Sequence, residues 1–198
     1  MDITKIAPPE PYKALIFDCD GTLADTMPFH ARSWAETYKT FGIEIAEQPF
    51  LDMGGLPNRA IIEHLNQQHG YTLDVEGTQE EKERRYLEML HSVMEITAVA
   101  DIARAHHGKV PMAVASSGLG RVVHQTLTIT GLLPLFDTVV TADDVTHGKP
   151  SPDIFLLAAE RLGIAPTDCI VYEDGDPGLE AARRAGMRAV DVRVLWRV

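Results

Sequence analysis

The chain has little cysteine and no long uninterrupted hydrophobic run. Its 198 residues include two cysteines, Cys19 and Cys169, which lie too far apart to form a CxxC motif. Two such thiols are typical of a protein in a reducing compartment, not of a secreted fold held by disulfides. No apolar run approaches the roughly 18–20 residues of a membrane span. The first residues also lack the basic and then apolar pattern of a signal peptide. We therefore expect a cytoplasmic protein with no membrane partner.

Positive charge is also scarce. The chain has 29 acidic and 18 basic side chains, and therefore a formal net charge of −11. A dedicated nucleic-acid binder normally has a basic face, so we expect no nucleic-acid partner. The length and an apolar content of 45% allow one sizeable core with a smaller attached subdomain. We expect the chain to be a monomer or a weak homodimer.

Short apolar runs without polar alternation predict buried strands. These runs occupy residues 14–17, 110–115, 138–141 and 169–172, with a weaker one at 188–192. Helical patterns at 120–130, 152–162 and 177–185 follow the second, third and fourth runs. Strands that alternate with helices predict an α/β fold with a Rossmann-like parallel sheet.

One interval in this alternation is too long for a single crossover helix. Nearly a hundred residues separate Asp18, at the end of the first strand, from Ser116, at the end of the second. Helix-spaced apolar residues within this interval lie at 27–41, 57–68 and 79–94. We therefore predict a core domain of residues 1–27 and 93–198, into which residues 28–92 are inserted as a small α-helical subdomain.

Polar residues follow the strands at their carboxyl ends, the edge where open parallel sheets bind ligands. They are Asp18, Asp20, Ser116, Ser117, Lys149, Glu173 and Asp174. Clustered carboxylates repel one another unless a cation lies among them, and oxygen donors without histidine or cysteine favour Mg²⁺ over zinc. A protonated lysine and the start of a helix both attract phosphate. This combination predicts phosphoryl transfer, in which one aspartate can accept the phosphoryl group.

Four motifs in this set resemble, in order, those of the haloacid dehalogenase superfamily. They are Asp18-Cys-Asp20-Gly-Thr22, Ser116, Lys149 in Gly-Lys-Pro-Ser-Pro-Asp, and Glu173-Asp174. The resemblance is to the branch of sugar-phosphate phosphatases and β-phosphoglucomutase-like proteins. It implies that Asp18 is the nucleophile and that Asp20 is the general acid and then the general base. It also implies that Ser116, Ser117 and Lys149 bind the phosphoryl oxygens. Mg²⁺ would be held by Asp18, the Asp20 carbonyl oxygen and Asp174, with Glu173 in or next to the shell.

The inserted helices resemble the small helical cap of this family. The resemblance implies substrate contacts from residues of the cap, namely His30, Trp34, Gly55, Arg59 and Lys82. A histidine or tryptophan at such a place can also serve only to pack the cap. Arg59 and Lys82 can likewise belong to solvated helix faces.

We therefore predict a Mg²⁺-dependent phosphatase that hydrolyses small phosphorylated sugars through an aspartyl phosphate. One alternative is a phosphosugar mutase, which returns the phosphoryl group to the sugar. A second is a sugar-phosphate-binding protein without activity. The intact set of Asp18, Asp20, Lys149 and Asp174 argues against that second alternative, because a binding protein needs no acid/base group beside a nucleophile.

Overall fold

Within the part of the chain that the computed structural model describes, residues 3–196, five strands form one parallel sheet. They are β1 (Ala14–Phe17), β2 (Met112–Ala115), β3 (Thr138–Val140), β4 (Cys169–Glu173) and β5 (Arg188–Asp191), in the order β3-β2-β1-β4-β5. The central strand β1 pairs with β2 and β4, so that Phe17 lies opposite Val114 and Tyr172. The predicted fold class is confirmed, and all five predicted strands are present within two residues of the expected bounds.

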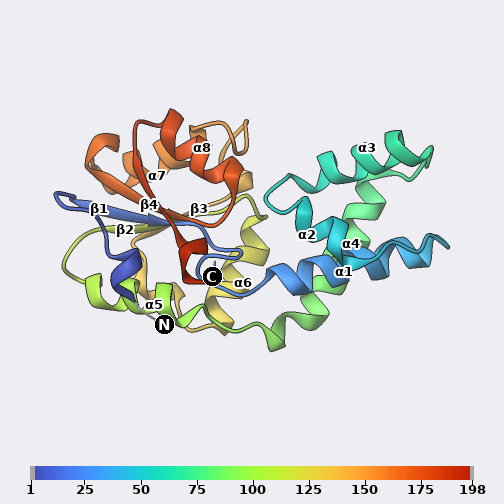
Figure 1. Cartoon of the computed structure of the whole chain (residues 1–198), viewed down its shortest axis with the longest axis horizontal. Helices are drawn as coiled ribbons and strands as arrows, with labels where there is room; N and C mark the ends of the chain where they lie inside the picture. Colours follow the sequence, from blue (N-terminus) through green and yellow to red (C-terminus); the bar gives the residue numbers. More distant parts are fainter. Residues whose placement is uncertain (1–2, 197–198) are drawn as a thin grey trace. The chain divides into compact units, whose positions relative to one another are not determined.

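Helices cover both faces of the sheet, as Figure 1 shows. Leu15 and Phe17 of β1 pack in one core cluster with α5 (Thr97–His106) and α6 (Gly120–Ile129). Their neighbours Ala14 and Ile16 pack in a second cluster with α7 (Asp153–Leu162) and α8 (Asp176–Arg184). Successive strand side chains point to opposite faces, so an unbroken apolar run is what a sheet buried on both sides requires.

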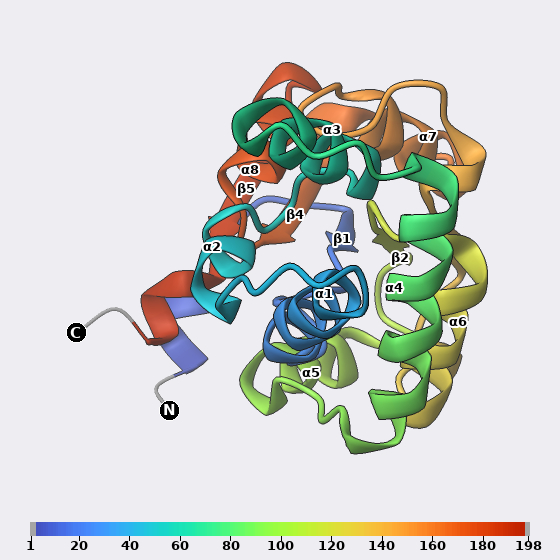
Figure 2. The same ribbon diagram turned by 90° about the vertical axis from the view of Figure 1, so that its right-hand side faces the viewer.

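The chain divides into two compact units. The α/β unit runs to Asp25 and resumes at Met94, and the helical unit comprises Thr26–Val93. The helical unit holds α1 (Met27–Thr40), α2 (Glu47–Asp52), α3 (Asn58–His69) and α4 (Val75–Met89). Helix α1 packs against α2 and α4, and α3 packs against α4 (Figure 2). The buried side chains of this unit form their own apolar cluster, which includes Trp34, Tyr38, Phe50, Ile62 and Leu65.

Short 3₁₀ segments complete the secondary structure. They are η1 (Ile3–Ile6), η2 (Leu90–Ser92), η3 (Leu133–Leu135), η4 (Ala142–Asp144), η5 (Pro166–Asp168) and η6 (Val192–Leu195). None of the helices within residues 3–196 is both long enough and apolar enough to cross a membrane.

Two helices were missed and one prediction of a helix start was wrong. Helix α4 begins at Val75 and not at residue 79, because the Asp74 side chain caps it by accepting a hydrogen bond from the Gly77 backbone nitrogen at 2.7 Å. Helix α5 carries Val99, Ile102 and Ala103 on its buried side, a spacing that sequence inspection could have found. Helix α2 is only six residues long and gives too weak a pattern for such an inspection.

Candidate active site

The first motif forms a tight turn directly after the central strand. Asp18 follows β1 and donates its backbone N–H to the carbonyl oxygen of Tyr172 on β4 at 3.0 Å. The carbonyl oxygen of Cys19 then accepts from the backbone nitrogens of Leu23 and Ala24 at 2.9 and 3.0 Å. Gly21 adopts a φ of 79°, which a residue with a side chain rarely adopts. The turn therefore fixes Asp18 and Asp20 at the carboxyl edge of the sheet.

Lys149 lies between two carboxylates and is 5% exposed. Its Nζ donates to Oδ1 of Asp18 at 2.6 Å and to Oε2 of Glu173 at 3.0 Å. The ring of Phe155 lies below the ammonium, 5.0 Å from Nζ to the ring centroid. Residues separated by more than a hundred positions in the chain thus meet in one buried ion cluster.

Three carboxylates gather beside this lysine. Asp18, Glu173 and Asp174 each offer an oxygen atom, and these oxygens lie within 4.8 Å of one another. Oδ1 of Asp174 accepts a hydrogen bond from the Thr22 hydroxyl at 3.0 Å. Oε1 of Glu173 accepts one from the Gly175 backbone nitrogen at 3.0 Å. These donors orient the carboxylates and leave an all-oxygen group of the kind that binds a hard divalent cation.

The ionisation of these groups follows from their burial. Burial, and then the negative charge of Asp18, raise the pKa of Glu173 to about 8 and that of Asp174 to about 7. Burial also raises the pKa of Asp18, although Lys149 opposes the rise. Burial alone would lower the pKa of the Lys149 ammonium, but the carboxylates of Asp18 and Glu173 raise it above its usual value. The site therefore keeps its lysine charged and holds more carboxylates than one lysine can neutralise.

The second motif brings hydroxyl and amide groups to the same edge. The buried Ser116 follows β2, and its hydroxyl donates to Oδ2 of Asp20 at 3.4 Å. The same hydroxyl oxygen accepts from the Gly118 backbone nitrogen at 3.0 Å. Ser117 is half-buried in the turn that leads to α6. The structure thus brings Asp18, Asp20, Ser116, Lys149, Glu173 and Asp174 to one end of the sheet.

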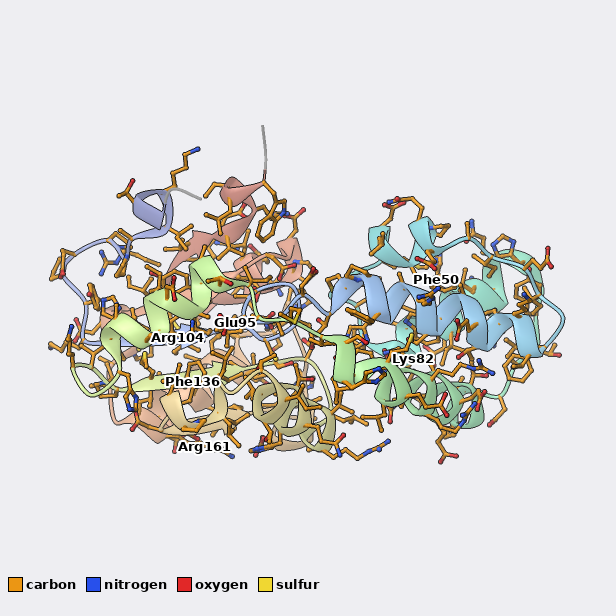
Figure 3. The ribbon with its side chains drawn as sticks, turned by 90° about the horizontal axis from the view of Figure 1, so that it is seen from below. Phe50, Lys82, Glu95, Arg104, Phe136 and Arg161 are labelled. Atoms are coloured by element: carbon orange, nitrogen blue, oxygen red, sulfur yellow. The ribbon has the colours of Figure 1, made fainter. Side chains whose placement is uncertain are left out.

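In the helical unit, His30 and Lys82 come together. Lys82 Nζ lies 2.8 Å from His30 Nδ1, and the His30 ring stacks on that of Tyr86 with centroids 4.1 Å apart. Nζ also lies 5.5 Å from the centroid of the Trp34 ring. Trp34 itself is 3% exposed and stacks on Phe50. Figure 3 labels Lys82 and Phe50, which come from α4 and α2 respectively.

The other two residues expected in the cap, Gly55 and Arg59, are both exposed. Gly55 is exposed in the turn between α2 and α3, with a φ of 84°. Arg59 lies on α3 with a side chain that is 56% exposed, and it pairs with Glu76 at 2.5 Å and Glu63 at 3.5 Å. The ion-pair partners of Arg59 are therefore carboxylates of the same helical unit.

Sequence reasoning missed some residues that orient the site. Thr22 was noted only as part of a motif, yet its hydroxyl holds Asp174. Gly178 lies against the carboxylate of Glu173. Thr22 lies two residues from the predicted site residue Asp20, which is a usable signal, whereas Gly178 offers none.

Comparison with known proteins identifies the family of this chain. The family model described as haloacid dehalogenase-like hydrolase matches residues 15–192, which include every motif at the sheet edge. The chain belongs to this family. The family resemblance and the prediction of a hydrolase are thereby confirmed.

Individual members of the family resemble the chain over most of its length. The fructose-1-phosphate phosphatase YqaB of Escherichia coli is 40% identical over 94% of this chain and 99% of its own. A phosphorylated carbohydrates phosphatase of Thermotoga maritima is 30% identical, over 90% of this chain and 83% of its own. The crystal structure of CbbY from Rhodobacter sphaeroides, in complex with phosphate, covers 90% of this chain and 85% of its own with a TM-score of 0.79 and 26% identity.

Proposed function

We propose that this chain is a Mg²⁺-dependent phosphatase that hydrolyses small phosphosugars through an aspartyl-phosphate intermediate. One observation carries the proposal: the buried carboxylate of Asp18, at the end of the central strand, lies 2.6 Å from Lys149 and next to two further carboxylates. A nucleophile of this kind needs a positive charge for the incoming phosphate and a cation for its own charge. Lys149 supplies the first, and the carboxylates can bind the second.

The residues present fit a magnesium ion. Carboxylate oxygens of Asp18, Glu173 and Asp174 lie within 4.8 Å of one another, and burial disfavours their ionisation together. We assign Asp18, Asp174 and the carbonyl oxygen of Asp20 as ligands, with Glu173 in or next to the shell. When bound, Mg²⁺ would offset the negative charge that the nucleophile and the phosphate bring together.

The chemistry of the protein residues follows in two steps. In the first, an oxygen of Asp18 attacks phosphorus, the bond from phosphorus to the sugar oxygen breaks, and Asp20 gives a proton to that oxygen. In the second, Asp20 takes a proton from water, which attacks the phosphorus and releases inorganic phosphate and free Asp18. The phosphoryl oxygens would be held by Lys149, Ser116 and Ser117. Stabilising the negative charge on these oxygens is the main way in which enzymes accelerate phosphoryl transfer.

The helical unit, Thr26–Val93, is assigned the role of a cap that excludes water during the first step. Its candidate substrate contacts are His30, Trp34, Gly55, Arg59 and Lys82. Two features support the substrate class of small phosphosugars. Two of the relatives described above are a fructose-1-phosphate phosphatase and a phosphorylated carbohydrates phosphatase by name. The chain also has a separate helical unit, to which the family resemblance assigns the substrate contacts.

A single assay tests the function and separates its alternatives. The purified protein is incubated with Mg²⁺ and a panel of phosphosugars, and both free phosphate and isomerised sugar phosphate are measured. Release of phosphate is the expected result. Isomerisation that needs a sugar bisphosphate as primer would instead identify a mutase. Tight binding without either product would identify a binding protein.

We further propose that the enzyme works in the cytoplasm as a monomer or weak homodimer, without nucleic-acid or membrane partners. The small number of cysteines and the net charge of −11 support this assignment. Cell fractionation and light scattering over a range of protein concentrations would test it. A stable tetramer or a membrane-bound pool would contradict it.

A further inference from the structure

The carboxylate of Glu173 is held in one orientation by both of its oxygens. Oε1 accepts from the Gly175 backbone nitrogen at 3.0 Å, and Oε2 accepts from Lys149 Nζ at 3.0 Å. The residue is 4% exposed, so solvent offers little alternative hydrogen bonding. The position of this carboxylate therefore decides whether Lys149 has one carboxylate partner or two.

The space for this carboxylate comes from Gly178, a buried residue of α8. A Cβ atom built on Gly178 would lie 2.5 Å from Oε2 of Glu173 and closer still to Oε1 and Cδ. Real Cβ atoms essentially never approach a heavy atom outside their own residue and its chain neighbours within 3.0 Å. The carboxylate of Glu173 thus occupies the volume that any side chain at position 178 would need.

Neither the backbone nor the helix explains a glycine at this position. Gly178 is not among the glycines with positive φ, so its backbone conformation is open to any residue. It is the third residue of α8, where glycine forms a helix less readily than alanine does. The helix continues with alanines at positions 181 and 182, which are buried without difficulty. What distinguishes position 178 is the contact with Glu173.

We propose that Gly178 is a positioning residue, which leaves room for the Glu173 carboxylate and thereby sets the carboxylate's contact with Lys149. The catalytic consequence of this inference rests on the proposed function, whereas its structural part does not. With alanine at position 178, the carboxylate, which is the far end of a flexible side chain, would have to move away from the added Cβ atom. Its hydrogen bond with Lys149 would then lengthen or break, and its oxygen would shift relative to those of Asp18 and Asp174.

A double-mutant cycle tests the contact directly, because only residues that interact give non-additive effects. Gly178→Ala is made in three backgrounds: the natural chain, Glu173→Gln and Glu173→Ala. Glutamine keeps the size of the side chain without its charge, and alanine removes both. The thermal midpoint is measured without metal, and the Mg²⁺ dissociation constant is measured by calorimetry. Neither measurement needs a sugar phosphate.

In the natural background, Gly178→Ala is expected to lower the midpoint and to weaken Mg²⁺ binding about 10–100-fold, as changes next to metal ligands usually do. It should lower the midpoint similarly in the Glu173→Gln background. In the Glu173→Ala background the midpoint should stay the same or rise, and Mg²⁺ binding should change by less than about twofold.

Equal losses in all three backgrounds would overturn the proposal, because Gly178 would then act without Glu173. If Gly178→Ala alone does not fold, recovery of folding in the double variant with Glu173→Ala supports the contact, and failure of the double variant overturns it. A chain that releases no phosphate from any phosphosugar would refute the proposed function and leave the result of the thermal cycle standing.

Discussion

Each of the two units buries a lysine, and the surroundings of the two lysines differ. Lys149 in the α/β unit is 5% exposed, and Lys82 in the helical unit is 4% exposed. Lys149 contacts the carboxylates of Asp18 and Glu173. The contacts of Lys82 include an imidazole nitrogen of His30 and the faces of the Trp34 and Tyr86 rings, with centroids 5.5 and 5.4 Å away.

The difference separates two kinds of task. A lysine between carboxylates stays protonated and fixed in position. Such a lysine suits the phosphoryl group, because the negative charge of that group must be stabilised at the same position in every substrate. Lys82 lies beside an imidazole and two aromatic rings, in the unit to which the proposed function assigns the substrate contacts. We therefore expect changes in the α/β unit to affect turnover with every substrate, and changes in the helical unit to affect the choice of substrate.

The comparison would fail most clearly if Asp18, the proposed nucleophile, could be replaced without loss of activity. Asn at position 18 keeps an oxygen that can accept from Lys149, so Asp18→Asn should fold with a melting temperature close to that of the natural chain. It should also keep a rise in melting temperature on addition of Mg²⁺. Its turnover should fall by on the order of 10⁴-fold or more, as in other enzymes that lose a nucleophile. Unchanged release of phosphate by the purified variant would remove Asp18 from this role.

A smaller but still large effect is expected at Asp20. Asp20→Ala removes the carboxyl group that would give the proton to the leaving oxygen, and such proton transfers contribute about 10²–10⁴-fold to rates. A substrate whose leaving group needs no proton, such as an aryl phosphate, should suffer less in the first step than a sugar phosphate. Burst kinetics with the aryl phosphate measure this difference. Equal slowing of the burst with both substrates would argue against a role as general acid.

The sequence predicts the two units unequally, for physical reasons. Parallel strands bring their carboxyl ends to one edge, so residues that follow separate apolar runs can be assigned to one site from the sequence alone. The helix at Asp153–Leu162 was likewise predicted from a local pattern, at residues 152–162. The pairing of Lys82 with His30 joins α4 to α1 across 52 positions, and no local pattern of either helix predicts it. The contact of Gly178 with Glu173 was hidden because a missing side chain leaves no chemical signal.

The two lysines can be compared with one matched substitution. Lys→Met keeps much of the length and apolar character of the side chain and removes its charge. Lys149→Met should lower kcat about 10²–10³-fold with any phosphate ester, as does the loss of one donor at a developing negative charge. Lys82→Met should instead raise KM for the preferred phosphosugar by about 10-fold, which corresponds to one lost hydrogen bond of about 1.4 kcal/mol.

A simple aryl phosphate is the control for this pair, because it has no sugar hydroxyl groups. Its hydrolysis should fall with Lys149→Met and stay nearly constant with Lys82→Met. If Lys82→Met slows the aryl phosphate as much as Lys149→Met does, the division of tasks between the units is wrong.

The smallest expected effect concerns stability without metal. The pKa of Glu173 is raised to about 8 and that of Asp174 to about 7, so the folded chain binds these protons more tightly than the unfolded chain does. The resulting stability is fully present below the unfolded values near pH 4, and it is lost as the pH rises through 7 and 8. Without metal, the melting temperature should therefore fall between pH 6 and pH 9, by about 2–4 °C for each kcal/mol lost in a chain of this size.

Mg²⁺ should counteract this loss, because it binds the ionised carboxylates and releases their protons. The rise in melting temperature on adding Mg²⁺ should consequently be larger at pH 9 than at pH 6. Glu173→Gln removes one of the two titrating groups and should flatten the pH dependence, whereas Lys82→Met should leave it unchanged. A slope that persists in Glu173→Gln and disappears in Lys82→Met would place the titration in the helical unit and reverse the comparison between the two lysines.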